Sequence, residues 1–123
     1  MAKHNEVGKW GEDIVCDYLR QKGYTVVERN WREGHYELDV IALKGNRIVF
    51  GEVKTRSDRD CDPFDAIDAR KMHRMLSAAN VYIQSHDVKQ EPQCDVFGVT
   101  GSPDDYKLEH LEDAFLPTIQ TYK

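Results

Sequence analysis

The order of the elements along the chain predicts an α/β fold, with a central mixed sheet flanked by helices. Two patterns carry this prediction. Apolar residues recur at helical spacing near the amino terminus and again after residue 64, whereas polar and apolar residues alternate between residues 36 and 54. A chain of 123 residues can build one hydrophobic core, so we expect a single domain over residues 1–123, with its core at about residues 5–116.

The first element is expected to be a helix over residues 6–22, with Asn5 as its N-cap and Gly23 at its end. The apolar residues that recur at helical spacing, and that we expect to be buried, are Val7, Trp10, Ile14, Val15, Tyr18 and Leu19. Glu12 lies at the edge of this stripe, where a glutamate is most often solvated. A strand over residues 24–29 follows, and then a loop that contains Trp31 and Gly34.

Residues 36–43 and 48–54 are expected to form a hairpin, because each alternates polar and apolar residues and a glycine-containing turn separates them. Side chains alternate between the two faces of a strand. On the first strand this rule assigns one face to Leu38, Val40 and Ala42, and the other to Glu37, Asp39 and Ile41. On the second strand it places Glu52 and Lys54 with Ile48 and Phe50.

The second half of the chain is expected to supply a charged loop at residues 55–63 and a long helix at about residues 65–86. The apolar stripe of this helix contains Phe64, Ile67, Met75, Ala78 and Tyr82. A polar connection over residues 84–93 leads to a strand at 94–99, a turn at 102–105 and an edge strand at 106–111. A last helical turn at 113–116 and a frayed tail from residue 118 complete the chain.

Composition sets the broad class. The chain is 40% hydrophobic and 32% charged, which is typical of a soluble protein, and no apolar run is long enough for a membrane helix or a signal peptide. Cys16, Cys61 and Cys94 are odd in number and scattered, and no histidines show ligand spacing, so we expect a cytoplasmic protein without disulfides or zinc.

The net charge of −5 argues at first against nucleic acid as a partner. Residues 1–86 hold 14 basic and 14 acidic residues, however, so the whole deficit lies in residues 87–123. The basic residues of this first part could therefore contact nucleic acid. The alternative is that they form a solvated surface of mixed charge, since aspartates are interspersed among them. Affinity for plain duplex is therefore expected to be modest and sensitive to salt.

The hairpin carries the candidate chemistry. Burying an unpaired carboxylate costs several kcal/mol, roughly, so acids survive in apolar surroundings when they are paired or bind a metal. Asp39 and Glu52, with the backbone carbonyl of Val53, are candidate ligands for Mg²⁺ or Mn²⁺, and Lys54 could orient water or neutralise charge on a phosphate. The alternative is a simple cross-strand ion pair, worth roughly 0.2–1 kcal/mol.

Five further residues are candidates around this site. Glu37 shares the expected face of Asp39 and could hold a second ion or orient a ligand. His35 is a general base by residue type, although a histidine at a loop edge is usually polar surface. Arg56, Lys71 and Arg74 are candidate contacts for substrate phosphates; for Lys71, in the middle of an apolar stripe, the alternative is a side chain that snorkels to solvent.

Asp39, with Glu52 after 13 positions and Lys54 two positions later, resembles the PD-(D/E)xK motif of restriction-endonuclease-like nucleases. The chain as a whole resembles the UPF0102 (YraN-like) family, a predicted endonuclease group of that fold. The matching positions are residues 8–12, 18–19, 23–24, 29–30, 37–39, 50–54, 66–67, 95–96 and 114–115, with Arg56, Pro63, Lys71, Ala79, Tyr82 and Leu111. Tyr36 and Gly51 depart from the family pattern, which usually has a glycine and a bulky residue there, and an arginine is missing before Asp95.

The resemblance implies an αβββαβ core and a bacterial Mg²⁺- or Mn²⁺-dependent nuclease that hydrolyses phosphodiester bonds, with DNA favoured as substrate. It also implies that Glu12 assists the metal ligands and that Lys71 contacts the substrate. Two alternatives stay open from the sequence. One is a nucleic-acid-binding module of the same fold that does not cleave, and the other is an interaction protein whose apolar hairpin packs against a second copy.

Overall fold

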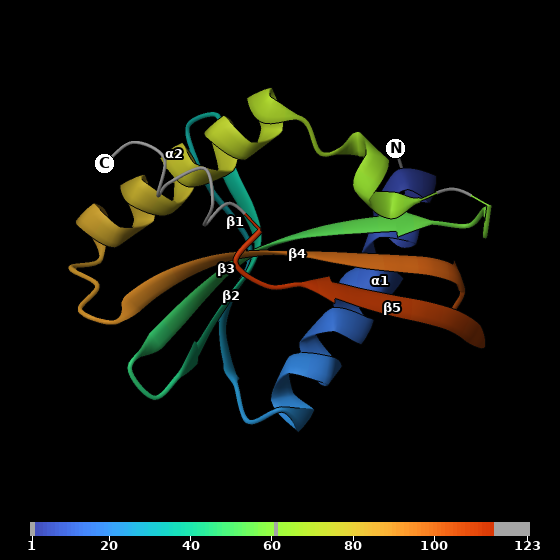
Figure 1. Ribbon diagram of the computed structural model, residues 1–123, viewed down its shortest axis with the longest axis horizontal. Helices are drawn as coiled ribbons and strands as arrows, with labels where there is room; N and C mark the ends of the chain where they lie inside the picture. Colours follow the sequence, from blue (N-terminus) through green and yellow to red (C-terminus); the bar gives the residue numbers. More distant parts are fainter. Residues whose placement is uncertain (1, 61, 115–123) are drawn as a thin grey trace.

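The computed structural model describes residues 2–60 and 62–114, with side chains from residue 8 onward except that of Ala66. The elements are α1 (Ala2–Gln21), β1 (Thr25–Glu33), β2 (Tyr36–Lys44), β3 (Arg47–Arg56), the 3-10 turn η1 (Pro63–Ala66), α2 (Ala69–Ser85), β4 (Glu91–Ser102) and β5 (Asp105–Leu111). The strands form one sheet in the order β1-β2-β3-β4-β5, antiparallel except for the parallel pair β3 and β4. Figure 1 shows α1 and α2 on opposite faces of this sheet. The predicted α/β fold, with its order of helix, three strands, helix and strand, is confirmed.

The predicted helix boundaries are partly wrong. Helix α1 begins at Ala2, so Asn5 lies within it rather than capping it, because neither glycine nor proline interrupts residues 2–7. Gly23 follows the helix with φ of +94°, a left-handed conformation that glycine adopts without strain, so the predicted end is correct.

The predicted long helix is in fact two elements. In η1 the Asp62 carboxylate caps the turn by accepting a hydrogen bond from the Phe64 amide. Ile67 is then extended, and α2 begins at Ala69 after a second cap, in which Asp68 accepts from the Lys71 amide. An aspartate side chain readily accepts a hydrogen bond from the free amides at the start of a helix. Asp62 and Asp68 therefore divide a segment that apolar periodicity alone predicts to be one helix.

The strands extend beyond their predicted ends. Strand β1 continues through the expected loop to Glu33 and buries Trp31, while β3 includes the first residues of the expected loop at 55–63. Strand β4 begins at Glu91, within the expected polar connection, and buries Gln93. The turn and edge strand after β4 are as predicted.

Some predictions fall on residues that the structure does not describe. The predicted final helical turn and tail beyond residue 114 lie outside the described residues, as does Cys61. Cys16 and Cys94 are free thiols.

The sheet separates two hydrophobic clusters. The cluster on the α2 side contains Ile41, Ile48 and Phe50 among its buried residues, and the cluster on the α1 side contains Val40 and Ala42. Both faces of the hairpin are covered within one chain, so its buried apolar side chains do not provide the surface that the alternative of packing against a second copy requires. Whether the protein forms a dimer stays a prediction. In the part of the chain that the structure describes, no helix combines the length and apolar character required to span a membrane.

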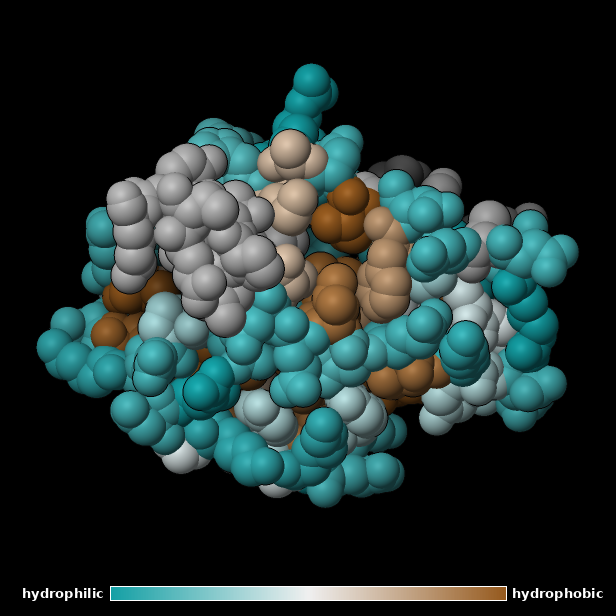
Figure 2. Space-filling model, viewed as in Figure 1, coloured by the Kyte–Doolittle hydropathy of each residue, from teal (hydrophilic) through white to brown (hydrophobic). Residues whose placement is uncertain are grey.

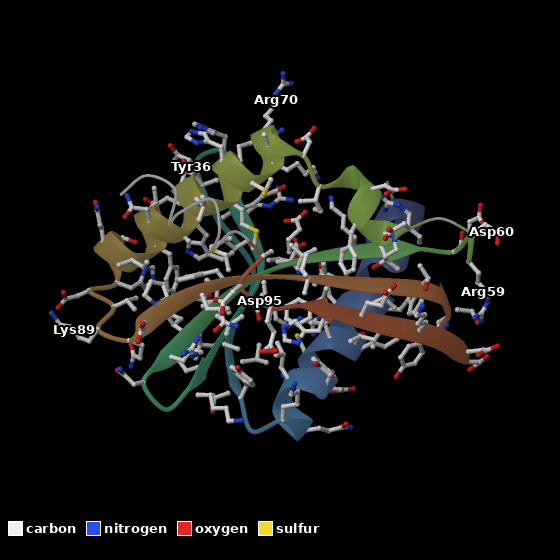
Figure 3. All side chains as sticks on the ribbon, viewed as in Figure 1. Tyr36, Arg59, Asp60, Arg70, Lys89 and Asp95 are labelled. Carbon is white, nitrogen blue, oxygen red and sulfur yellow. The ribbon has the colours of Figure 1, made fainter. Side chains whose placement is uncertain are left out.

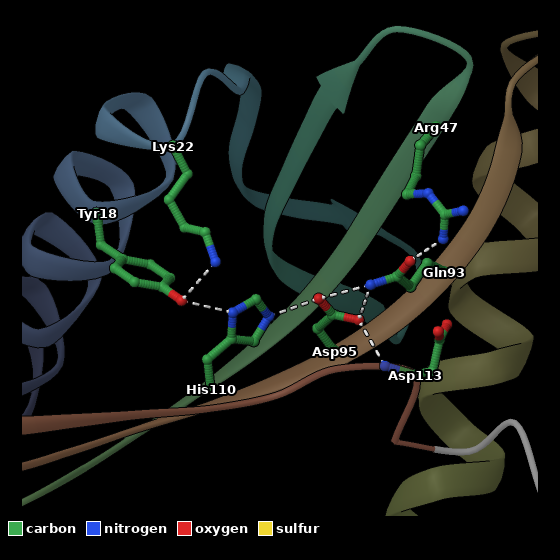
Figure 4. A network of polar contacts seen from close by, with 7 residues as sticks. All are labelled: Tyr18, Lys22, Arg47, Gln93, Asp95, His110 and Asp113. Carbon is green, nitrogen blue, oxygen red and sulfur yellow. Dashed lines mark hydrogen bonds and ion pairs between the residues drawn. The ribbon is translucent and has the colours of Figure 1, made fainter.

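A polar network runs along the α1 side of the sheet, over β4 and β5 (Figure 4). The buried Asp95 carboxylate lies 2.6 Å from His110 Nε2 and accepts hydrogen bonds from the Gln93 side chain and the Asp113 amide. His110 Nδ1 lies 2.8 Å from the Tyr18 hydroxyl of α1. In Figure 3, Asp95 lies in the middle of the molecule, whereas Arg59, Asp60 and Lys89 lie at its periphery. The network satisfies a fully buried carboxylate and ties the last strand to the first helix.

Candidate functional site

Strands β2 and β3 separate at Asp39. Their pairing runs from Lys44 and Arg47 to Val40 and Gly51 and goes no further. At the next position the Asp39 carboxylate, instead of a backbone carbonyl, accepts a hydrogen bond of 2.7 Å from the Val53 amide. A carboxylate that replaces a backbone acceptor leaves an opening between two neighbouring strands.

This separation also corrects one sequence prediction. Leu38 packs in the cluster on the α2 side, whereas Val40 and Ala42 pack in the cluster on the α1 side, so the three do not share a surrounding core. Strict alternation fails here because the pairing of β2 with β3 ends between Leu38 and Val40, although β2 stays paired with β1.

Glu52 and Lys54 lie on the α2 side of β3, as alternation predicts. Lys54 Nζ is 3.0 Å from Glu52 Oε2, and Lys71 Nζ of α2 is 3.7 Å from the same oxygen. The Lys54 side chain is only 13% exposed, so its ammonium has little access to bulk water. Lys71 therefore reaches the carboxylate cluster rather than snorkelling away from it.

Glu12 reaches the same region from α1. Gly11 allows this approach, because a Cβ at that position would overlap the Thr55 side chain of β3. The Glu12 carboxylate accepts a hydrogen bond of 2.9 Å from Asn30 and lies 3.8 Å from the guanidinium of Arg29. Glu12 and Asp39 line one hollow of the surface, together with Gly8, Lys9, Arg29, Asn30, Arg32, Glu37 and Leu38.

The charges of the cluster are poorly balanced around Asp39. Burial, and then the nearby charge of Glu52, raise the pKa of Asp39 to about 7, although the hydrogen bond from Val53 opposes this rise. Burial lowers the pKa of Lys54, but Lys71 and Glu52 outweigh it and the net pKa is raised. The neighbouring Lys54, as the largest cause, and burial lower the pKa of Lys71.

The other predicted residues lie around this cluster. Arg74 and His35 line a second hollow, which Glu52 and Lys71 also line. Glu37 borders both hollows and forms an ion pair of 3.2 Å with Arg32. Arg56 lies at the end of β3, where its guanidinium donates to the Thr55 carbonyl, and it lines neither hollow.

Asp39 and Glu52 are suitable donors for a hard divalent cation. Both are carboxylates, and the pKa of Asp39 is raised first by burial and then by the nearby charge of Glu52, which a bound cation would offset. Among residues 2–60 and 62–114, no three His, Cys, Asp or Glu side chains are grouped as a metal site. Mg²⁺ is commonly bound by one or two protein carboxylates, with water and substrate completing its shell, so Asp39 and Glu52 stay predicted ligands. The Val53 carbonyl stays a prediction as a ligand, since the contact observed from Val53 is that of its amide.

Sequence reasoning missed the supports of the site. Asn30 donates to Glu12, and Arg29, whose closer partner is Asp13 at 2.7 Å, lies 3.8 Å from it. The sequence placed Arg29 among the basic residues near the site and both residues among the positions matching the family, but gave neither a role beside Glu12. Gly51 also has a structural explanation, because a Cβ there would come within 2.6 Å of Val40 Cγ1 and 2.8 Å of Phe97 Cε2. Its departure from the family pattern is therefore a matter of packing beneath the site.

Comparison with known proteins identifies relatives over nearly the full length. The model of a family described as "Uncharacterised protein family UPF0102" matches residues 11–99. A UPF0102 protein of Bacteroides fragilis is 41% identical over 120 residues, which cover 97% of this chain and 99% of that protein. A UPF0102 protein of Bacteroides thetaiotaomicron is 39% identical with the same coverage, and one of Flavobacterium psychrophilum is 41% identical over 94% of this chain and 98% of its own. The chain belongs to the UPF0102 family.

Proposed function

We propose that this protein is a Mg²⁺- or Mn²⁺-dependent nuclease of the PD-(D/E)xK type, which hydrolyses phosphodiester bonds of nucleic acid, with DNA as the favoured substrate. The observation that supports the proposal is the end of the pairing between β2 and β3, where the buried Asp39 carboxylate lies near enough to Glu52, Glu12 and Lys54 for their charges to shift its pKa, and where Lys54 and Lys71 both approach Glu52. A simple ion pair between Glu52 and Lys54 would leave the second lysine beside Glu52, and the buried Asp39 carboxylate nearby, without a function.

Each residue has a chemical role in the proposal. Asp39 and Glu52 would hold the ion, which would polarise a phosphate oxygen and lower the pKa of a bound water. The Lys54 ammonium, held 3.0 Å from Glu52, would orient water or stabilise the charge that develops on the phosphate in the transition state. Glu12 would support the ion from the α1 side, and Lys71, with Arg74 and Arg56 further out, would contact substrate phosphates.

Manganese binding tests the proposal without knowledge of the substrate. Isothermal titration calorimetry at pH 8 should show saturable Mn²⁺ binding to the wild type and a loss of at least tenfold in affinity for Asp39→Asn. A nuclease screen over single-stranded, duplex and branched DNA, and over RNA, should then find cleavage that Asp39→Asn abolishes.

The control is Asp17→Asn, the same chemical change at an exposed residue of α1 that forms only a surface ion pair with Arg20. It should bind manganese and cleave as the wild type does. Cleavage that persists in Asp39→Asn would refute the assignment of the site.

A binding module without cleavage is the second candidate. It is supported by the two lysines that already neutralise Glu52, and by the departure of the chain from the family pattern at Tyr36. In that case neither protein would bind manganese, even with nucleic acid present, and Asp39→Asn would bind nucleic acid as well as the wild type or better.

A further inference from the structure

A hollow lies between the start of β2 and helix α2, next to Glu52. We call it the Tyr36 pocket; it is lined by His35, Tyr36, Glu37, Glu52, Ile67, Lys71, Arg74 and Met75. Figure 3 places Tyr36 beside α2. Figure 2 shows that this face of the molecule is mostly hydrophilic around a smaller group of hydrophobic side chains. The roles proposed above for Asp39, Glu52 and Lys54 do not explain why a partly apolar hollow lies beside Glu52.

Two walls of the Tyr36 pocket are suited to a flat, apolar group. The Tyr36 ring is partly buried, packs against the cluster on the α2 side, and has its centre 4.5 Å from that of the His35 ring. On the other side are Met75, which is 6% exposed and belongs to the core, and Ile67, which packs against the same cluster. Aromatic rings stack on nucleobases regardless of sequence, at about 1–3 kcal/mol per base.

The charges of the pocket are placed for a phosphate at its rim. Lys71 extends from α2 toward Glu52, and Arg74 lies one turn further along the same helix. The two acids of the lining have partners, since Glu52 pairs with Lys54 and Lys71, and Glu37 pairs with Arg32. With acids and bases both present, a free phosphate gains little here, whereas a ligand that adds a stacked ring gains from the walls as well.

We propose that the Tyr36 pocket binds one unstacked nucleotide of a single-stranded nucleic acid, with the base against Tyr36 and its phosphate toward Lys71 and Arg74. The inference rests on the proposed nuclease function, because it places the backbone of that nucleotide beside Glu52. A paired base cannot enter such a pocket without leaving its stack, so the substrate class is single-stranded or contains an unpaired segment. The net charge of −5 agrees with this choice, since stacking rather than a broad basic field would supply affinity.

Binding by a protein that cannot cleave tests the inference. In an Asp39→Asn background, fluorescence anisotropy should show tighter binding of a labelled 12-nucleotide single strand than of the same sequence as a blunt duplex. Adding Tyr36→Ala should weaken single-strand binding by about fivefold or more, as expected for one lost stacking contact. Tyr36→Trp, which keeps an aromatic face, should retain the affinity.

The matched control is Tyr106→Ala, since Tyr106 is an exposed tyrosine of β5 that is absent from the lining. Circular dichroism and thermal melting check that each variant folds. DNA and RNA strands are tested side by side; Tyr36-dependent binding of either supports the inference, and equal binding by the Tyr36→Ala variant, or no preference for the single strand, overturns it.

The outcome separates this inference from the nuclease proposal. If single-strand binding depends on Tyr36 but neither metal binding nor cleavage is found, the pocket stands and the nuclease function fails. If Asp39-dependent cleavage is found but Tyr36→Ala leaves single-strand binding unchanged, the nuclease stands and the pocket fails.

Discussion

Asp39 makes the stability of the metal-free protein depend on pH. Its carboxyl has a folded-state pKa of about 7, above the ordinary value of 3.8, because burial and Glu52 disfavour the charged form. A raised pKa contributes stability that is present below about pH 4 and is lost as the pH rises to about 7. Asp39→Asn should therefore be more stable than the wild type at pH 8, by about 1–3 kcal/mol, and nearly equal to it at pH 4.

Urea unfolding in EDTA at the two pH values measures this difference. The asparagine side chain keeps an oxygen that can accept the Val53 hydrogen bond, so the comparison isolates the charge. Asp17→Asn, at an exposed position, should show no such pH dependence. An asparagine variant that is less stable at pH 8 than at pH 4, relative to wild type, would contradict the assigned cause.

At this scale, sequence reasoning placed some of the charged side chains correctly but could not give their surroundings. Strand alternation and spacing correctly placed Glu52 and Lys54 on one side of β3. They could not place Leu38, because its surroundings depend on a hydrogen bond between a side chain and the backbone of the next strand. The supports from Arg29 and Asn30 could not be predicted either, since they lie 17 and 18 residues from Glu12 and contact it only in the fold.

Strands β2, β3 and β4 approach one another closely at Gly51, and this leads to a prediction about the sheet. Gly51→Ala would push a methyl group against Val40 and Phe97, both fully buried, and should cost about 1–3 kcal/mol. Gly8→Ala is the matched change within α1, where nothing lies within 4 Å of the added Cβ. It should stabilise the protein by about 0.5–1 kcal/mol, because alanine favours a helix over glycine.

Thermal unfolding of the two variants at one pH compares them directly. Equal effects would mean that the sheet moves to accept the methyl group and that Gly51 is not required for packing.

Element types were more predictable than element boundaries. The hairpin was predicted from alternating polar and apolar residues, and the helices from apolar stripes, both of which are local patterns. The structure contains these strands and helices. The division of the second helix depended on competition between aspartate caps and apolar periodicity, and the length of β4 depended on pairing with β3 along its whole length. The first boundary is therefore set by local capping that outweighs apolar periodicity, and the second by a strand that is distant in the sequence.

The charge of the whole molecule limits how it can bind nucleic acid. Four basic residues are proposed here to contact substrate: Lys54, Arg56, Lys71 and Arg74. At most four neutralised phosphates predict a slope of log affinity against log salt no steeper than about −4 for duplex DNA, with Kd above about 1 μM at physiological salt. Anisotropy titrations of the Asp39→Asn variant between 50 and 300 mM KCl would measure the slope, and a steeper one would reveal a basic surface that these residues do not provide.

The position of β4 has a consequence for when the candidate site forms during synthesis. Residues 52–56 of β3 extend beyond the pairing with β2, so β4 is the strand that pairs with them, and Glu52 lies opposite Val96. A nascent chain that ends at α2 can close the hairpin but leaves Glu52 and Lys54 on an unsupported strand end. The ribosome must translate past residue 100 before the acids and lysines are fixed together, so unfinished chains carry the residues of the site without its geometry.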